Sequence, residues 1–213
     1  MSCSSRCDKR LDGLGDKCID WFGECPPTGF GLSSTANTNS SGAYSGNDNT
    51  PTLKISGVGN GEVVIVYSDS TCETEVTRET ATETTIEITL SSLSEGTYTF
   101  YAKTIDASGN ESDCSSVNVS YTVDSTAPSA PSSISNSDSK SYGSDPPSFT
   151  IGGTSSGDTI TLYTDSSCTT QVGSQTSSGS STTITSSSLS AGTYTFYTKS
   201  TDDAGNSSSC SST

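Results

Sequence analysis

The sequence contains one long segment twice, and this repeat limits the possible folds more than any other feature. Residues 96–116, GTYTFYAKTIDASGNESDCSS, return as GTYTFYTKSTDDAGNSSSCSS at residues 192–212, and the same 96-residue shift aligns two pairs of cysteines. A repeat of this length fits one β-sandwich domain of about 100 residues and is too long for a solenoid turn. The repeat predicts an all-β chain with sandwich domains at residues 26–124 and 125–213, after a separate element at residues 1–25.

Alternating apolar and polar residues predict the strands of the first repeat. After an opening edge strand come Thr52–Ser56, Glu62–Ser68, Glu75–Ala81, Thr84–Leu90, Thr97–Ile105 and Ser116–Val123. Val64 and Val66 align with apolar Ile160 and Leu162, whereas Val63 and Ile65 align with threonines. Since successive residues of a strand face opposite sides, the first set is expected to point into the core.

The second repeat is predicted to have the more polar core. Ile86, Ile88 and Leu90 align with Thr182, Ile184 and Ser186, and Ala102 aligns with Thr198. Tyr98 and Tyr194 each follow an S-x-G-T sequence at the beginning of a predicted strand. Sandwich folds place a tyrosine there whose hydroxyl bonds to nearby backbone, so both are interpreted as packing residues.

The eight cysteines predict disulfides and an oxidising compartment, hence a secreted or cell-surface protein. Cys72 and Cys114 are 42 residues apart, as are Cys168 and Cys210. We therefore expect the pairs Cys72–Cys114 and Cys168–Cys210. No apolar run approaches the roughly 20 residues that a membrane-spanning helix needs, so no membrane span is expected.

Residues 1–25 contain the other four cysteines and the only tryptophan. Apolar residues and cysteines recur there at steps of three and four, the spacing of one helical face: Cys7, Leu11, Leu14, Cys18, Trp21 and Cys25. A hairpin of two short helices joined by Cys3–Cys25 and Cys7–Cys18 would use all four thiols, although three connectivities are open. Zinc binding is the alternative, disfavoured because no paired C-x2-C knuckle is present.

Charge and composition exclude several classes of function. The net charge is −15, and the chain lacks the clustered Lys and Arg that nucleic-acid binding requires, so no nucleic-acid partner is expected. The absence of histidine excludes Ser-His-Asp and Cys-His nucleophiles and every His-ligated metal centre. Glu73 with Glu75, or Glu83 with Glu87, could form an acid/base pair, but the second repeat lacks all four carboxylates. We interpret them as solvated surface charges and predict that the chain is not an enzyme.

A D-x-x-G-N segment follows the longest predicted strand of each repeat, at Asp106–Asn110 and Asp202–Asn206. The simpler interpretation is a tight turn, because Asn and Gly adopt unusual backbone angles. The alternative is a calcium site, in which Asp106, Asn110 and Asp124 supply the oxygen ligands that Ca²⁺ prefers. Calcium is the one cofactor that the sequence suggests.

The succession GTYTFYAK, DASGN and VDSTAPSAP resembles bacterial immunoglobulin-like repeats of large surface adhesins and biofilm-associated proteins. The resemblance covers roughly residues 27–213 and implies two tandem immunoglobulin-like domains that act as a rod displaying a binding element. In some members aspartates bind Ca²⁺ at the domain junctions, which by motif match would be Asp106 and Asp124 here. Many such repeats lack the cysteines, and residues 1–25 match no part of the pattern.

Three hypotheses for the function follow. The first is a non-catalytic extracellular structural or adhesive protein, the stalk of a bacterial surface adhesin or fibre, with a cell-surface protein or glycan as its partner. The second is a homopolymer, a filament subunit whose domains complete one another by strand exchange. The third is a carbohydrate-binding module, in which Trp21 with Phe22, or Tyr101 and Tyr197, stack on a sugar ring.

The closing strand of the first repeat has no copy in the second. Shifted by 96 residues, Val117–Val123 would recur from position 213 onward, where the sequence stops. The second sandwich is therefore expected to lack this strand and to expose an unpaired sheet edge. Two explanations are open: the chain is a fragment of a longer repeat array, or a strand of another chain fills the gap.

Overall fold

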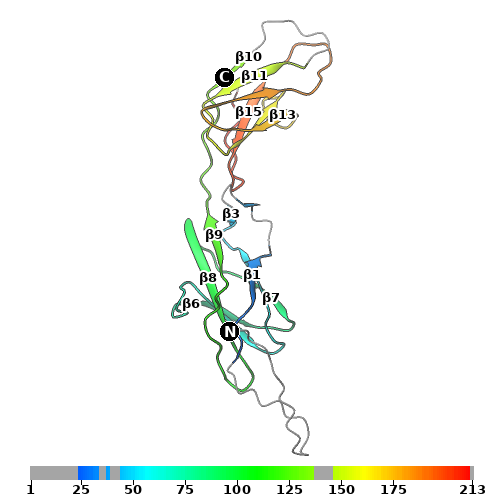
Figure 1. The fold of residues 1–213 in the computed structure, drawn as a ribbon. Helices are drawn as coiled ribbons and strands as arrows, with labels where there is room; N and C mark the ends of the chain where they lie inside the picture. The colour runs from blue at the N-terminus through cyan, green and yellow to red at the C-terminus, as the bar shows by residue number, and fades with distance from the viewer. Residues whose placement is uncertain (1–23, 34–36, 39–43, 137–145, 212–213) are drawn as a thin grey trace, which may run out of the picture. The chain divides into compact units, whose positions relative to one another are not determined.

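The computed structural model describes residues 24–33, 37–38, 44–136 and 146–211. All the regular structure in these residues is β-strand, in two successive sandwiches (Figure 1). The prediction of an all-β fold with tandem sandwich domains is confirmed. The predicted helical hairpin falls within residues 1–23, outside the described residues.

The first sandwich has a three-stranded sheet on one side of its core. Its order is β1 (Gly29–Leu32), β4 (Thr52–Ser56), β7 (Thr85–Thr89), all antiparallel. Lys54 pairs with Glu87 on the outer face, while Ile55 pairs with Ile86 on the inner face. The alternation predicted from the sequence therefore fixes which face of this sheet is buried.

The opposite sheet of the first sandwich has six strands. Its order is β2 (Asn37–Thr38), β3 (Tyr44–Gly46), β9 (Val119–Val123), β8 (Gly96–Ile105), β5 (Val63–Tyr67), β6 (Glu75–Thr80). The pairing of β3 with β9 is parallel. The strand bounds differ from the predicted ranges by at most three residues.

The second sandwich repeats the plan with fewer strands. One sheet has the order β10 (Ser133–Asn136), β11 (Ser148–Gly152), β14 (Ser181–Thr185), and the other has the order β13 (Gln171–Thr176), β12 (Thr159–Tyr163), β15 (Tyr197–Thr201). All four pairings are antiparallel. In the described part of this sandwich, β15 is an edge strand.

The cores contain the residues that the repeat alignment places inside. Val64, Val66, Ile160 and Leu162 are fully buried. The second core is more polar, as predicted, because buried Ser186 and Thr198 occupy the positions of buried Leu90 and Ala102. The Thr198 hydroxyl is the one buried side-chain oxygen or nitrogen of the described residues without a hydrogen-bond partner.

The first sandwich also buries apolar side chains on the outer face of its larger sheet. Ile65 is only 3% exposed, although its alignment with Thr161 predicts an outward position. It contacts Tyr67 and Cys72, and Tyr101 and Cys114 pack against this group. The side chain does point away from the core, but the disulfide-bearing segments cover it. The matching positions of the second repeat are more polar, and include Thr159, Thr161 and Thr201.

Candidate functional site

Each sandwich contains one disulfide at the same place. Cys72 bonds to Cys114 with a Cα–Cα distance of 5.8 Å, and Cys168 bonds to Cys210 with a distance of 6.0 Å. Both pairs are those expected from the 42-residue separation. The first cysteine lies between two paired strands, β5 and β6 or β12 and β13, and the second lies after β8 or β15. Each bond therefore joins two loops that border the same sheet.

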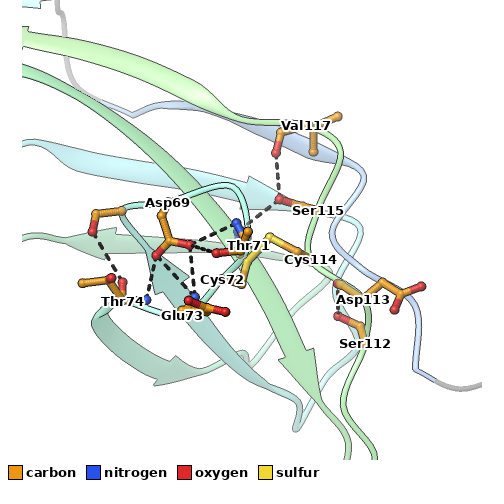
Figure 2. The surroundings of a disulfide bond; sticks show 12 residues. Asp69, Thr71, Cys72, Glu73, Thr74, Ser112, Asp113, Cys114, Ser115 and Val117 are labelled. Carbon is orange, nitrogen blue, oxygen red and sulfur yellow. Dashed lines mark hydrogen bonds between the residues drawn. A yellow bond between two sulfur atoms is a disulfide. The ribbon is translucent and has the colours of Figure 1, made fainter.

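An aspartate organises the loop that holds the first cysteine (Figure 2). The Asp69 carboxylate accepts hydrogen bonds from the backbone N–H groups of Thr71 (3.0 Å), Glu73 (3.2 Å) and Thr74 (2.7 Å), and from the Thr71 hydroxyl (2.6 Å). The loop folds around the carboxylate because these donors converge on it from residues on both sides of Cys72. Sequence analysis missed this role of Asp69.

The second repeat contains the same loop. The Asp165 carboxylate accepts from the N–H groups of Ser167 (3.0 Å), Thr169 (3.2 Å) and Thr170 (2.6 Å), and from the Thr169 hydroxyl (3.0 Å). The signal in the sequence was available: D-S-T-C-E-T and D-S-S-C-T-T align without a gap. Aspartate followed by hydroxyl residues is typical of loops in which a side chain bonds to backbone a few residues on.

The cysteines of these loops have an unusual backbone. Cys72 has φ = 54° and Cys168 has φ = 51°, the left-handed region, and they are the only non-glycine residues with positive φ in the described chain. An L-residue in this region is disfavoured and persists only where its surroundings hold it. The aspartate-centred loop supplies that constraint and directs each sulfur toward its partner.

Serine side chains fix the segment that carries the second cysteine. The N–H groups of Ala102 and Thr104 donate to the hydroxyls of Ser115 and Ser112, each at 3.0 Å. In the second repeat the Ser200 N–H donates to the Ser208 hydroxyl at 3.0 Å. Cys114 thus lies between two serines that bond to β8, so hydrogen bonds position the segments at both ends of the disulfide.

The pKa values of the two loop aspartates are lowered because donors surround the carboxylates. For Asp69 the largest cause is the Thr71 hydroxyl, followed by the Thr74 N–H. For Asp165 the Thr170 N–H is the largest cause, and the pKa falls to about 2. A folded-state pKa below the unfolded value of 3.8 stabilises the fold above pH 3.8, and this stabilisation is lost as the pH falls toward the folded value.

We expect Asp165→Asn to lower stability at pH 7 and to flatten the dependence of stability on pH between about pH 4 and pH 2. Asparagine has the shape of aspartate, but its amide has one acceptor oxygen and no charge, whereas the carboxylate has two acceptor oxygens and a negative charge. Urea denaturation of the full chain at pH 2 to 7 measures the effect. Asp113→Asn is the control, because the exposed Asp113 carboxylate accepts no hydrogen bond in the described structure. Equal effects of the two changes would contradict the role given to Asp165.

The D-x-x-G-N segments form tight turns after β8 and β15. The Asp106 carboxylate accepts from the N–H groups of Ser108 (2.8 Å) and Asn110 (2.9 Å) and from the Asn110 amide (2.7 Å), and Gly109 has φ = 86°. Asp202 accepts from the Asn206 N–H at 2.8 Å and from its amide at 3.1 Å. The simpler interpretation of these segments therefore matches their geometry.

Asp106, Asn110 and Asp124 were also considered as calcium ligands. The Asn110 amide donates to the Asp106 carboxylate within the turn after β8, and Asp124 follows β9. Within the described residues no group of three or more acidic or cysteine side chains is placed to hold a metal ion. Calcium binding by Asp106, Asn110 and Asp124 stays a prediction.

The tyrosine expected to bond to nearby backbone does so in the second repeat. The Tyr194 hydroxyl donates to the Ser190 carbonyl oxygen at 3.1 Å. Tyr101 and Tyr197, considered as sugar-stacking residues, are half-buried, and Tyr101 packs beside the Cys72–Cys114 disulfide. This position favours a structural role for Tyr101. Trp21 and the predicted disulfides of Cys3, Cys7 and Cys18 lie outside the described residues.

The carboxylates considered as catalytic pairs lie on the surface. Glu73, Glu75, Glu83 and Glu87 are all exposed. Glu75 forms an ion pair with Arg78. This arrangement agrees with the interpretation of these groups as solvated surface charges.

Among the described residues, Glu24 is the one carboxyl group whose pKa is strongly raised, to about 7. Partial burial is the largest cause, and the neighbouring Glu62 carboxyl adds to it. A raised pKa is one mark of a catalytic acid, but structural carboxyl pairs show it as well. Shifted by 96 residues, Glu24 and Glu62 align with Ser120 and Asp158, so the carboxyl pair has no counterpart at the equivalent place.

These features define a class of protein: tandem β-sandwich domains of immunoglobulin type, each with one disulfide that joins two loops. The family model of the bacterial Ig-like domain matches residues 26–125 and again residues 122–213. The chain therefore belongs to the bacterial Ig-like domain family. Among the described residues, no helix has the length and apolar character needed to cross a membrane.

Several solved structures match the chain at low sequence identity. The chicken CNTN1 FN1-FN3 domains match with a TM-score of 0.52 and 18% identity, over 88% of this chain and 64% of that one. The fibronectin(III)-like modules of Clostridium thermocellum CbhA match with a TM-score of 0.47 and 14% identity, over 85% and 90%. A biofilm-associated protein BSP domain matches with a TM-score of 0.28 and 19% identity, over 85% of this chain and 28% of that one. The chain thus spans less than two thirds of the length of the CNTN1 structure and of the biofilm-associated protein structure. No curated protein matches the sequence.

Proposed function

We propose that the chain is a non-catalytic, extracellular stalk segment of a bacterial surface protein, in which a disulfide braces each immunoglobulin-like domain against extension. The observation that carries the proposal is the repetition of one arrangement, Cys72–Cys114 and Cys168–Cys210, each within an aspartate-centred loop. Disulfides persist in oxidising compartments, which favours a location outside the cytoplasm. A cell-surface protein or glycan is the kind of partner that such a stalk serves.

The position of the disulfide suits a domain that transmits tension. In a stalk, force enters a domain where the chain enters and leaves it, which in the first repeat is near β1 and β9. The bond encloses residues 73–113, including β6, β7 and β8. Those strands cannot be pulled out into extended chain while the bond is intact, even after β1 and β9 have detached. Each domain can therefore lengthen only by its residues outside the bond.

Single-molecule stretching of the full chain tests the proposal. Unfolding one domain after reduction should release about 140 Å more chain than unfolding it with the bond intact, because 42 residues at about 3.3–3.6 Å each become free to extend. The double change Cys168→Ala with Cys210→Ala is the matched control, since only one of the two domains should then respond to reduction. Equal lengths with and without reductant would contradict the bracing role.

A further inference from the structure

Two residues that lead into the first domain, Glu24 and Cys25, contact it at two places. They are called the entry segment here. The Glu24 carboxyl is hydrogen-bonded to the carboxyl of Glu62, which comes directly before β5. The Cys25 carbonyl oxygen accepts a hydrogen bond of 2.8 Å from the hydroxyl of Thr104 in β8. Because β5 and β8 pair with each other, neighbouring strands of one sheet hold the entry segment.

The turn before β5 fixes the Glu62 side chain. Its carboxylate accepts the Gly59 N–H at 2.7 Å, and the Glu62 N–H donates to the Gly59 carbonyl oxygen at 3.2 Å. The carboxylate lies so close to Gly59 that it leaves no room for a Cβ there. The group that meets Glu24 is therefore held in place by the turn and is not a freely rotating surface side chain.

The second repeat uses the same two positions differently. Asp158 and Ser200 align with Glu62 and Thr104. The Ser200 hydroxyl donates to the Asp158 carboxylate at 2.7 Å, and Asp158 is only 8% exposed. These two side chains therefore bond to each other, whereas their counterparts in the first repeat both bond to the entry segment.

A hydrogen bond between two carboxyl groups requires a proton, because a carboxylate can only accept. Without that proton, Glu24 and Glu62 would be two like charges in contact. Partial burial favours the protonated form of Glu24 most strongly, and Glu62 and the Asp106 carboxylate after β8 add to its effect. The Cys25 N–H acts in the opposite direction and is outweighed.

We propose that the carboxyl pair of Glu24 and Glu62 makes the attachment of the entry segment to the first domain depend on pH, so that the segment is bound at acidic pH and released above neutral pH. The chain has no histidine, so no imidazole titrates in this range. The proposal is independent of the stalk function, because it concerns only how the entry segment is held.

The direction of the pH dependence follows from the two states of Glu24. In the detached segment the carboxyl has its ordinary pKa of 4.5, whereas in the attached segment the pKa is raised to about 7. The attached state therefore keeps its proton where the detached state has lost it. Attachment is strongest below pH 4.5 and weakens as the pH rises from 4.5 to about 7.

The test is a pH titration of the isotope-labelled full chain by NMR, from about pH 4 to pH 9, with its disulfides intact and a chelator present. We expect the Glu24 carboxyl carbon to titrate with a midpoint near pH 7. The nuclear Overhauser contact between Thr104 and Cys25 should disappear over the same range. Exchange of the Cys25 amide, corrected for its intrinsic pH dependence, should become roughly tenfold faster.

Two results of this titration would overturn the proposal. Midpoints below about pH 5 for both Glu24 and Glu62 would show that the two carboxyls share no proton. A raised midpoint without any change at Cys25 and Thr104 would show that the pair titrates but does not control the attachment.

Glu24→Gln separates the effect of charge from that of shape. The glutamine amide donates to the Glu62 carboxylate at every pH, so the contact between Thr104 and Cys25 should persist to about pH 9. Glu83→Gln is the matched control, because it changes an exposed glutamate of the same domain and should leave the titration as in the unchanged chain. If Glu24→Gln kept the pH dependence, another group would be responsible and the proposal would be wrong.

Discussion

Removing the disulfide of either repeat, by Cys72→Ala with Cys114→Ala or by Cys168→Ala with Cys210→Ala, should lower the free energy of unfolding of that domain by about 4 kcal/mol. The value follows from the loop of 42 residues that each bond closes in the unfolded chain. Domains are usually stable by only about 5–15 kcal/mol, so the loss is a large fraction of the total.

Removing the disulfide should take away a larger fraction of the stability of the second domain than of the first. Its core contains polar residues such as Ser186 and Thr198, and it lacks the apolar group that Ile65 and Tyr67 form beside the first disulfide. Urea denaturation of the full chain, with one pair replaced at a time, separates the two transitions, and the domain left intact serves as the control. A loss below about 1 kcal/mol in both domains would contradict the chain-entropy account.

Phe100→Ala should destabilise the first domain by about 3–5 kcal/mol, whereas Phe196→Ala should cost the second domain less than half as much. Phe100 is 1% exposed, and truncating a fully buried aromatic side chain removes its transfer free energy and leaves a cavity. Phe196 occupies the same place in an identical sequence but is only half-buried, so less apolar surface returns to water.

Thermal or urea unfolding of the two single variants measures this difference within one chain. Tyr98→Phe, which keeps the aromatic ring in the same strand, is a control for changes at neighbouring positions and should have a much smaller effect. Equal losses for Phe100→Ala and Phe196→Ala would show that the two segments are packed equally well in solution, contrary to the structure.

The sequence predicted the strands and disulfides because these depend on local pattern and on the repeat. Alternation located Thr52–Ser56 without error, since the buried face of β4 consists of Leu53 and Ile55. The common offset of the cysteines predicted both bonds, because two copies of one fold place equivalent residues together. The aspartate-centred loops obey the same logic, and the aligned D-S-T-C and D-S-S-C segments were sufficient to find them.

Features that depend on distant parts of the chain were not predictable in the same way. GTYTFY forms a full strand only where β9 pairs with it, and strand preference reflects such neighbours more than the segment itself. A shared calcium site depends in the same way on where distant parts of the chain lie, and the site suggested for Asp106, Asn110 and Asp124 stays a prediction.

The disulfide of each domain also determines whether a proteolytic cut separates the chain into two molecules. A single cut anywhere in residues 73–113 would break the backbone within β6, β7, β8 or the loops between them, yet Cys72–Cys114 would still join the two fragments. The same holds for residues 169–209 of the second domain. In an extracellular setting rich in proteases, a chain cut once within either segment would therefore remain one covalently linked molecule. Only reduction, or a second cut outside these segments, would separate its two ends.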